Sequence, residues 1–545
     1  MLLSLLRREL VVSMLLSALP TALAWHASPL PRPAIASRST PLIASAADVC
    51  DLDDAATLCT YDGAEIDARF ADRPLEVAGR VADIALAALR VKLAGDDGGE
   101  TLRGELATLG PVFCKIGQTM ATRPDIVGLE TSRNLGKLQD AVAPEGGGPA
   151  VAMATLRSEL PAAEALLANI SAAPVAAASL AEVYRATRTS DGAELAIKIQ
   201  RPGLERKVAL DFHVLRRILA LAQERFGLAG DIPTIQSVLD EVGGGIFAEL
   251  DFETEARHIR RFDALYAKRL AELGVVVPKV DPSLTSPRVL ATEWIDGTPP
   301  RSLPDAERQA LARTAVRCLA MQLMSDGFIH CDPHEGNLLG LADGRVALLD
   351  FGLMAQMRRD HQEAMASGVL NIMAENYGAL EEVFKGMGVL NTQVDDLRRD
   401  GVDEPFSDAI RRCMTGGAAD ERARNLIQDD DGGDRRRAFG QLYEELGELA
   451  FSYYFTIPSY YILVMRAFVT LEGIALANDG DEFNMYEATA PYARRTLLTP
   501  RTAGGRALLR AAFLSSGGRR ALRQGLKLPR PWRWRPWRWW PWRVA

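Results

Sequence analysis

The 545-residue sequence predicts an α+β fold, because one region shows strand periodicity and the regions around it show helical periodicity. The strand signal is clearest at Leu195–Gln200, where Leu195, Ile197 and Ile199 alternate with more polar residues. Helical spacing of apolar residues occupies four other stretches: Asp67–Leu93, Glu100–Thr122, Leu204–Arg225 and Thr234–Leu265.

Further strands are expected around this first strand. Asp191-Gly192 predicts a tight hairpin turn just before it. Arg288–Ile295 and Val346–Leu349 also carry strand signals. The apolar stretch Tyr453–Ala477 is interrupted by Pro458, Arg466 and Glu472, so it predicts a buried helix and not a membrane span.

Composition excludes several classes of protein. A hydrophobic content of 48% and a charged content of 25% are typical of a globular chain. The six cysteines form no CxxC pair, which disfavours a zinc site or a disulfide framework, and no P-loop or HExxH motif occurs. The formal net charge of −8 hides a basic C-terminal tail, since no acidic residue follows Glu487.

The N-terminus has the composition of a two-part targeting leader. Residues 1–24 contain Arg7 and Arg8 followed by the apolar run Val11–Leu23, as in a secretory signal. Trp25–Ala47 then contains arginine, serine and proline but no acidic residue, as in a transit peptide. A signal followed by a transit-like stretch predicts two-step import into a plastid. Plain secretion and a mitochondrial presequence are the alternatives.

The sharpest functional signal is His330–Asn337, followed by Asp350-Phe351-Gly352 after an apolar strand. Asn337 lies five residues after Asp332, which is the spacing of a protein-kinase catalytic loop. Phosphoryl transfer needs a carboxylate near the acceptor, and an amide and a second carboxylate for Mg²⁺. The pattern therefore predicts Asp332 as the catalytic carboxylate and Asn337 and Asp350 as metal ligands.

A kinase-like site also needs a strand lysine for the nucleotide phosphates and a helical carboxylate that orients it. Lys198 lies on the predicted strand, on the face opposite Ile197 and Ile199. The segment Glu249–Glu255 supplies candidate carboxylates. Each residue alone would be an ordinary surface charge, so the indication comes from their order along the chain.

Two features of ordinary protein kinases are missing. No GxGxxG precedes the lysine strand, and the equivalent loop contains Ala176, Ala177, Ala178 and Ser179. Alanine restricts the backbone freedom of such a loop, so the nucleotide geometry should differ. Cys331 replaces the arginine after His330, which leaves phosphorylation of an activation loop without an obvious basic partner.

These departures occur together in the UbiB family of atypical kinases, also called AarF-domain or ABC-one-like kinases, and the chain resembles that family from about Asp67 to Leu498. The most specific match is the KxGQ motif within Leu109–Gln118. Three further motifs match: the lysine strand Ile197–Pro202, the ExD motif Glu249–Asp251 and the hinge Thr292–Gly297.

The resemblance implies a protein-kinase-like two-lobed fold, with the N-terminal KxGQ helices folded across the cleft. It implies ATP or ADP with Mg²⁺ as cofactors, and a pair between Lys198 and Glu255. The other implied nucleotide-site residues are Lys115, Gln118, Glu249, Glu293 and Ile295. Lys115 paired with Glu249 would hinder a peptide substrate, so ATP hydrolysis, autophosphorylation and a small lipid-like acceptor all remain open.

The segment Ile462–Ala475 most resembles the plastid branch of the family. That branch is implicated in prenylquinone metabolism, covering plastoquinone and tocopherol, at thylakoids and plastoglobules. The resemblance therefore implies a lipid or prenylquinone-type partner and peripheral membrane association. The resemblance to the plastid branch agrees with the plastid import that the leader predicts.

The expected division of the chain has seven parts. They are a leader (1–48), a helical extension with the KxGQ motif (49–165), an N-lobe (166–296), a C-lobe core (297–390), a charged insertion (391–437), C-terminal helices (438–500) and a basic Trp/Arg-rich tail (501–545). The tail suits an anionic membrane interface. Three other interpretations of the tail are a segment that binds single-stranded nucleic acid, a disordered segment, and an error in the gene prediction. Of the possible partners, nucleic acid is not expected.

Three functions are therefore considered. The first is an active ATPase or kinase that supports quinone synthesis. The second is a nucleotide-binding pseudokinase-like scaffold for lipid-synthesis enzymes. The third is a membrane-associated regulator that acts through its tail. Intact Lys198, Asp332, Asn337 and Asp350 favour the first.

Overall fold

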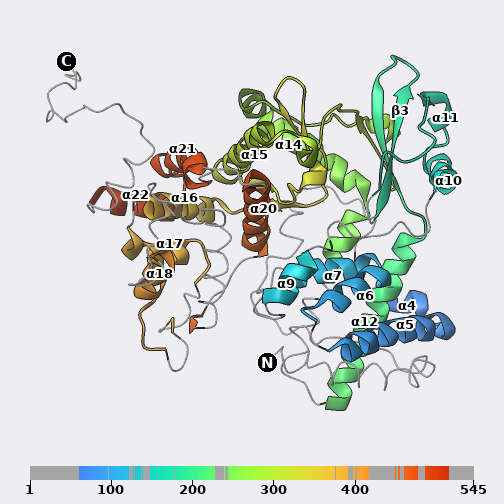
Figure 1. Cartoon of the computed structure of the whole chain (residues 1–545), viewed down its shortest axis with the longest axis horizontal. Coiled ribbons are helices and arrows are strands. Elements are labelled where there is room, and N and C mark those ends of the chain that lie inside the picture. The colour runs from blue at the N-terminus through green and yellow to red at the C-terminus, as the bar shows by residue number, and fades with distance from the viewer. Residues whose placement is uncertain are drawn as a thin grey trace.

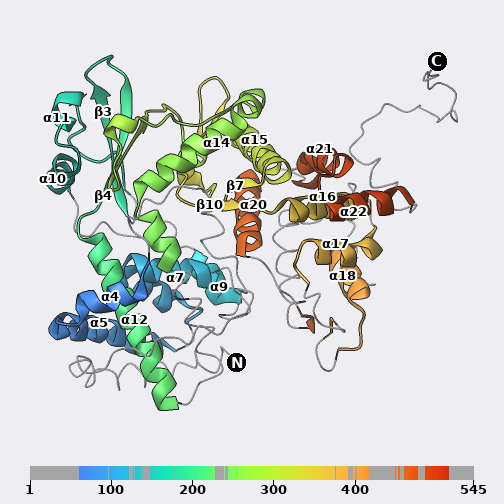
Figure 2. The same ribbon diagram turned by 180° about the vertical axis from the view of Figure 1, so that it is seen from behind.

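The computed structural model describes residues 61 to 514, with gaps. The described residues are 61–95, 97–121, 127, 129–136, 138, 148–177, 180–226, 239, 243–374, 376–390, 397–398, 402–415, 449, 452–454, 459–476 and 485–514. The predicted leader, most of the predicted insertion and the tail after residue 514 lie outside them. A β-sheet region, an N-terminal helical region and a C-terminal helical region are visible in Figures 1 and 2.

A five-stranded antiparallel sheet forms the small lobe. Its strands are β1 (Leu167–Ala168), β2 (Ala176–Ala177), β3 (Ala181–Arg188), β4 (Glu194–Gln200) and β6 (Val289–Glu293), in the order β1-β3-β4-β6 with β2 paired to β3. Gly192 in the β3–β4 turn has a φ of +74°, which glycine adopts readily, and Asp191 accepts a hydrogen bond from the Ala193 N–H. The predicted hairpin and the strand around Lys198 are confirmed.

The two faces of this sheet have different neighbours. Tyr184, Ile197 and Ile199 point into a core that α10 (Pro149–Glu159) and α11 (Ala163–Leu166) cover. Lys198 lies on the opposite face, in register with Val183 and Leu290 of the adjacent strands. The alternation in the sequence thus separates the core face from the face that carries the lysine.

The helix α14 (Phe252–Leu273) lies beside the lysine face and packs into the core of the large lobe. Residues 243–249 are helical, but the chain then turns, and Asp251 has an extended backbone with φ −98° and ψ 100°. The expected helix over Thr234–Leu265 is therefore wrong in its bounds. The first helical run ends at Glu249, and Asp251 caps α14, an interruption that apolar spacing alone does not reveal.

The N-terminal region is a helical bundle. Its helices are α4 (Gly63–Phe70), α5 (Pro74–Ala94), α6 (Glu100–Leu109), α7 (Pro111–Ala121) and α9 (Leu129–Gly136). The helix α12 (Leu204–Phe226), which follows β4 in the sequence, packs into the same bundle. The single helix expected over Glu100–Thr122 is two helices. Gly110 has a φ of +109°, and Pro111 starts the next helix, so the chain turns a corner there.

A buried ion pair holds this corner. The Arg80 guanidinium on α5 donates to both carboxylate oxygens of Asp211 on α12, at 2.5 and 3.0 Å, and to the Leu109 carbonyl at 2.5 Å. Asp211 is fully buried. The start of α7, which carries the KxGQ residues, is thus fixed from two other helices.

The C-terminal region is mainly helical. Its helices are α15 (Asp305–Ser325), α16 (Arg359–Met373), α17 (Leu380–Gly386), α18 (Phe406–Thr415), α20 (Ser459–Leu476), α21 (Met485–Leu498) and α22 (Ala503–Leu514), with short 3-10 turns η4 (Pro300–Ser302), η5 (Glu335–Asn337) and η6 (Tyr377–Ala379). A further 3-10 turn, η3 (Pro282–Leu284), precedes β6 and contributes Leu284 to the core of the five-stranded sheet. The predicted strand Val346–Leu349 is confirmed as β9 (Val346–Leu348). Its neighbours β5 (Val275–Val276) and β8 (Leu338–Gly340) form a small sheet with it, and β7 (Phe328–His330) pairs with β10 (Met354–Gln356).

The apolar stretch around α20 is a core helix, as expected. Val464, Ala467 and Leu471 are fully buried in the main core. Among the described residues, no helix is long and apolar enough to cross a membrane.

Candidate active site

Lys198 lies at the centre of the candidate site. Its Nζ is 2.7 Å from Glu255 Oε2 on α14 and 2.8 Å from Asp350 Oδ2, which follows β9. The lysine and Glu255 side chains are 18% and 6% exposed, whereas Asp350 remains 37% exposed. Three residues from separate parts of the sequence therefore form one charged cluster, and only Asp350 faces the open side.

The electrostatics of this cluster follow from burial and charge. Burial, together with the nearby negative charge of Asp350, raises the pKa of Glu255 to about 7. Burial alone would raise the pKa of Asp350, but the ion pair with Lys198 outweighs it and holds that pKa well below its usual range. Burial disfavours the charged form of Lys198, and the two carboxylates outweigh this and raise its pKa. Asp350 is therefore an anion at all physiological pH values.

The loop that carries Asp350 is fixed by its backbone. His330 Nε2 donates to the Asp350 carbonyl at 2.5 Å, and His258 Nδ1 on α14 donates to the Phe351 carbonyl at 2.9 Å. The Phe351 ring is fully buried and makes edge contacts with His330 and Phe262 at centroid distances of 5.1 and 5.0 Å. Burial also lowers the pKa of His330, which favours the neutral form of its ring, and the bond to the Asp350 carbonyl then requires the tautomer with its hydrogen on Nε2.

The loop of Asp332 and Asn337 follows β7. The Asn337 amide Nδ2 donates to the Asp332 carbonyl at 3.0 Å, so the amide oxygen remains able to accept or to bind a metal. His334 Nδ1 accepts the Gly336 N–H at 3.0 Å, and His334 Nε2 lies 4.0 Å from Asp332 Oδ2. The backbone therefore fixes the relative positions of these side chains.

A cation approaches Asp332 from the C-terminal part of the chain. Arg466 Nη2 on α20 lies 3.4 Å from Asp332 Oδ1, and the Arg466 side chain is 19% exposed. The sequence indicated Arg466 only as an interruption of an apolar stretch. Its contact with Asp332 was missed, because 134 residues separate the two.

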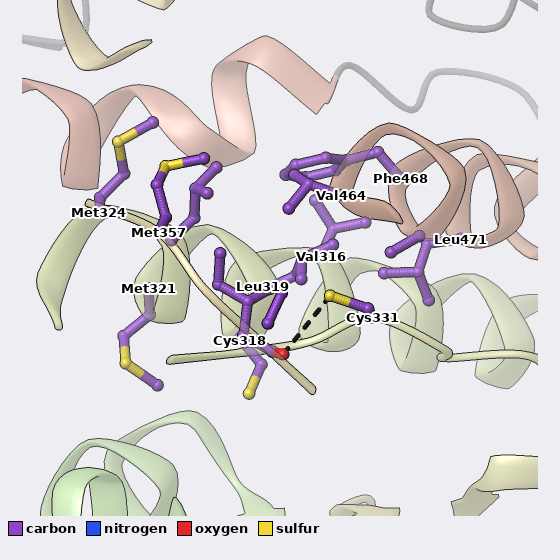
Figure 3. Close-up of a cluster of buried hydrophobic side chains, with 14 of the residues drawn as sticks. Val316, Cys318, Leu319, Met321, Met324, Cys331, Met357, Val464, Phe468 and Leu471 are labelled. Atoms are coloured by element: carbon purple, nitrogen blue, oxygen red, sulfur yellow. Dashed lines mark hydrogen bonds between the residues drawn. The ribbon is translucent and has the colours of Figure 1, made fainter. Parts of the chain in front are cut away.

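Cys331 lies between His330 and Asp332 and points away from the site. Figure 3 shows it against Val464, Phe468 and Leu471 of α20, and its thiol lies 3.5 Å from the Ile329 carbonyl. Burial raises the pKa of this thiol to about 12. The position that holds an arginine in ordinary kinases is thus buried in the hydrophobic core of this protein.

The KxGQ and ExD motifs meet. Lys115 Nζ on α7 pairs with Glu249 Oε1, and Gln118 lies one helical turn further along α7 and is half-buried. Asp251 Oδ1 accepts the Glu253 N–H at 3.0 Å and so caps α14. The ExD motif thus connects the pair of Lys115 with the helix that carries Glu255.

The predicted nucleotide loop is described only in part. Ala176 and Ala177 form the exposed strand β2 opposite Val183 and Glu182, whereas Ala178 and Ser179 lie outside the described residues. At the predicted hinge, Glu293 ends β6 and donates its N–H to the Lys279 carbonyl at 2.8 Å. Ile295 follows two residues later and is half-buried.

The connection after Asp350 is short. Only Leu353 to Arg358 separate Gly352 from the start of α16, and half of these residues form β10, paired with β7. β10 is held to α14 by a hydrogen bond of 2.8 Å from Arg261 to Gln356. The segment that is a long mobile loop in many kinases is here a single strand.

The donor set suits Mg²⁺. Asn337 and Asp350 offer an amide oxygen and a carboxylate, which are hard oxygen ligands. No group of three or more His, Cys, Asp or Glu side chains that could hold a metal is found within the described part of the chain. Mg²⁺ in phosphoryl-transfer sites is held by one or two protein side chains and takes its remaining ligands from phosphates and water, so Asn337 and Asp350 could hold it.

A lysine strand, a helical glutamate, a loop with Asp and Asn, and an Asp-Phe-Gly turn together define a protein-kinase-like fold and site. Comparison with known proteins agrees. Residues 139–384 match the family described as "ABC1 atypical kinase-like domain". The chain belongs to this family, which includes the AarF and UbiB proteins.

Several curated proteins are similar to the chain. "Protein ACTIVITY OF BC1 COMPLEX KINASE 3, chloroplastic" of Arabidopsis thaliana is 33% identical over 73% of this chain and 53% of its own length. An uncharacterized protein of Synechocystis, slr1919, is 34% identical over 73% of this chain and 67% of its own length. "Probable protein kinase UbiB" of Xanthomonas euvesicatoria is 31% identical over 61% and 62%. The matches thus span between about half and two thirds of these relatives.

A solved structure is also similar. The Rv3197–erythromycin complex from Mycobacterium tuberculosis aligns with 68% of this chain and 92% of its own, with 21% sequence identity and a TM-score of 0.40.

Proposed function

We propose that the chain is an ATP-binding, Mg²⁺-dependent atypical kinase or ATPase. The observation that carries this proposal is the bridge that Lys198 makes between Glu255 and Asp350. A lysine held in this way is oriented to receive the α- and β-phosphates of a nucleotide. Family membership supports a kinase-like activity, and the specific reaction is the part that we propose.

Each residue of the site has a proposed role. Lys198 binds the phosphates, and Glu255 holds the lysine in place. Asn337 and Asp350 would hold Mg²⁺, which neutralises developing charge on the phosphates when it is bound. Asp332 accepts the proton of the attacking hydroxyl or water, and Arg466 orients this carboxylate.

The bonds that change are those of the terminal phosphoryl group. The oxygen of the acceptor attacks the γ-phosphorus in line, the bond to the β–γ bridging oxygen breaks, and ADP leaves. The acceptor proton moves to Asp332. Because the chemistry needs mainly positioning, the fixed loops around Asp332 and Asp350 are well suited to it.

The nucleotide base and the acceptor are proposed from other parts of the site. Glu293 and Ile295 would contact adenine at the hinge, and Ala176 to Ser179 would lie over the phosphates. Lys115 paired with Glu249, with Gln118 nearby, would narrow the entrance for a peptide. We therefore propose a water molecule or a small lipid-like hydroxyl compound as acceptor.

The proposed setting is a plastid, with a role in prenylquinone metabolism and association with thylakoids or plastoglobules. Two observations support it: the leader-like composition of residues 1–48 and relatives whose names say chloroplastic. The basic Trp-rich tail supports contact with an anionic membrane surface.

The test is Mg²⁺-dependent ATP turnover by residues 49–545, with and without plastid-type liposomes and a phenol that resembles a quinone precursor. Asp350→Asn is the inactive variant, and Asp343→Asn, in an exposed turn, is its matched control. Turnover that rises with lipid and is lost only in Asp350→Asn would support the enzyme. Nucleotide binding without turnover under every condition would contradict it and favour the scaffold.

A further inference from the structure

His334 is a polar residue of the loop after β7 to which the proposed function gives no role. It lies two residues after Asp332 and three before Asn337. Cys331 and Pro333 on the same loop are buried, whereas the His334 side chain keeps 33% exposure, close to the 32% of Asp332. The loop therefore holds an imidazole ring beside the candidate catalytic carboxylate.

The backbone of the loop fixes the state of this ring. The Gly336 N–H can only donate, and it donates to His334 Nδ1 at 3.0 Å. Nδ1 therefore carries no hydrogen, and the hydrogen of the neutral ring is on Nε2. A Cβ at Gly336 would lie only 2.8 Å from the ring carbon Cε1, so a larger residue there would displace the ring. His334 thus presents an N–H donor in a fixed direction.

The two carboxylate oxygens of Asp332 have different neighbours. Oδ1 lies 3.4 Å from Arg466 Nη2. Within the part of the chain that the structure describes, Oδ2 accepts no hydrogen bond, and His334 Nε2 lies 4.0 Å from it. This separation is too long for a hydrogen bond. Oδ2 is therefore the oxygen that is left to accept the proton of the attacking hydroxyl or water.

From this arrangement, and on the basis of the proposed phosphoryl transfer, we infer that His334 donates its Nε2–H to a non-bridging oxygen of the phosphoryl group in transfer. An acceptor that gives its proton to Asp332 Oδ2 must lie within about 3 Å of that oxygen. The phosphorus that it attacks then lies beside His334 Nε2, because Nε2 is itself only 4.0 Å from Oδ2.

The chemistry of this contact is a hydrogen bond without proton transfer. The acceptor oxygen bonds to the γ-phosphorus, the bond to the β–γ bridging oxygen breaks, and the acceptor proton moves to Asp332 Oδ2. His334 keeps its Nε2 hydrogen throughout. Negative charge is spread over the three non-bridging oxygens during transfer, and a donor already aimed at one of them needs no reorganisation.

Two substitutions separate this role from a purely structural one. His334→Asn keeps an acceptor for the Gly336 N–H, since asparagine is a favoured capping residue, but its side chain ends near the position of Nδ1. The longer amide in His334→Gln reaches the position of Nε2 with an N–H donor. Asp343→Asn, in an exposed turn, is the control.

Steady-state ATP turnover by the full chain is the first measurement. His334→Asn should lower kcat on the order of 100-fold with little change in KM, and His334→Gln should recover at least about tenfold of that loss. A purely structural role predicts the opposite order, with His334→Asn close to the native chain and His334→Gln impaired. That order, or an equal loss in the two variants, would overturn the inference.

Binding of ADP with Mg²⁺ and aluminium fluoride, a mimic of the phosphoryl group in transfer, is the second measurement. Calorimetry should show that His334→Asn weakens this complex by roughly tenfold or more and leaves the affinity for ADP alone unchanged. Equal weakening of ADP alone, or an unchanged affinity for the complex, would overturn the inference.

The binding measurement also distinguishes a failure of this inference from a failure of the proposed activity. A native chain that binds the fluoride complex without turning over ATP would contradict the proposed activity, and the comparison with His334→Asn would still decide the role of His334. A native chain that binds ADP but not the fluoride complex would overturn the contact with the phosphoryl group.

Discussion

Arg466 on α20 lies 3.4 Å from the Asp332 carboxylate, across 134 residues of sequence. The cation that an ordinary kinase carries next to its catalytic aspartate in sequence is absent, because Cys331 occupies that position. The fold places a guanidinium near the same carboxylate from another helix.

Replacing Arg466 should therefore lower the turnover of ATP more than its binding. Arg466→Met leaves Asp332 without its neighbouring cation, and misplacement of the carboxylate should lower kcat roughly tenfold to a hundredfold with little change in KM. Arg466→Lys should restore part of the rate. Steady-state kinetics measure this, with the exposed Arg495→Met as the control. An unchanged kcat in Arg466→Met would show that the contact does not act on catalysis.

Asp350→Asn should remove the Mg²⁺-dependent part of ATP binding and lower turnover roughly 100-fold or more. The variant keeps the size of the side chain and the Lys198–Glu255 pair but removes the anion that the metal needs. Calorimetric titration with ATP, with and without Mg²⁺, measures the binding. Equal Mg²⁺ dependence in Asp350→Asn and in the native chain would refute the proposed metal ligand.

Cys331→Arg, which restores the residue of ordinary kinases, should destabilise the protein. Cys331 is fully buried against α20, so the new guanidinium would be an unpaired buried charge that costs about 3–5 kcal/mol. Cys331→Ala, the control, should cost only about 1 kcal/mol. Urea unfolding measures both. A Cys331→Arg variant as stable as Cys331→Ala would mean that this region is open to water.

Asp251→Ala should weaken the start of α14. Loss of the N-cap costs about 1 kcal/mol, and both Glu249 and Glu255 depend on this turn, so nucleotide binding should weaken as well. Asp62 caps α4, far from the site in sequence, and accepts the Ala64 N–H at 2.8 Å. Asp62→Ala should therefore lower stability without changing nucleotide binding. Hydrogen exchange and ATP titration distinguish the two variants, and an equal loss of binding in both would contradict this account.

The buried pair of Arg80 and Asp211 should make stability depend on pH. Burial raises the pKa of Asp211 to about 6, above its unfolded value of 3.8. Between these values the folded state binds the proton more tightly, so this contribution to stability is present at low pH and is lost as pH rises through 6. The slope should be at most about 1.4 kcal/mol per pH unit. Urea unfolding from pH 4 to pH 7 measures the free energy of unfolding, and Asp211→Asn should lack this part of its pH dependence. The same pH dependence in the native chain and in Asp211→Asn would contradict the raised pKa of Asp211.

Local patterns allowed much of the fold to be predicted. The β3–β4 hairpin could be predicted because Asp191-Gly192 and the alternation around Lys198 are local signals with a direct physical meaning. The order of Lys198, Asp332 and Asp350 likewise indicated the class of site. The start of α14 could not be predicted, because apolar spacing continues through residues 243–249 and hides the cap at Asp251.

Contacts between distant segments could not be predicted from spacing. Neither the contact of Arg466 with Asp332 nor that of His258 with the Phe351 carbonyl leaves a periodic signal. Arg466 and Glu472 are the two charged residues of the mainly apolar helix α20, so the sequence could have marked both positions but could not have shown which of them contacts Asp332.

The short strand β10 has a consequence for how such a protein can be controlled. The connection from Gly352 to α16 reads Leu-Met-Ala-Gln-Met-Arg and contains no serine, threonine or tyrosine. This segment therefore offers no hydroxyl group for phosphorylation, although phosphorylation of the corresponding segment regulates many protein kinases.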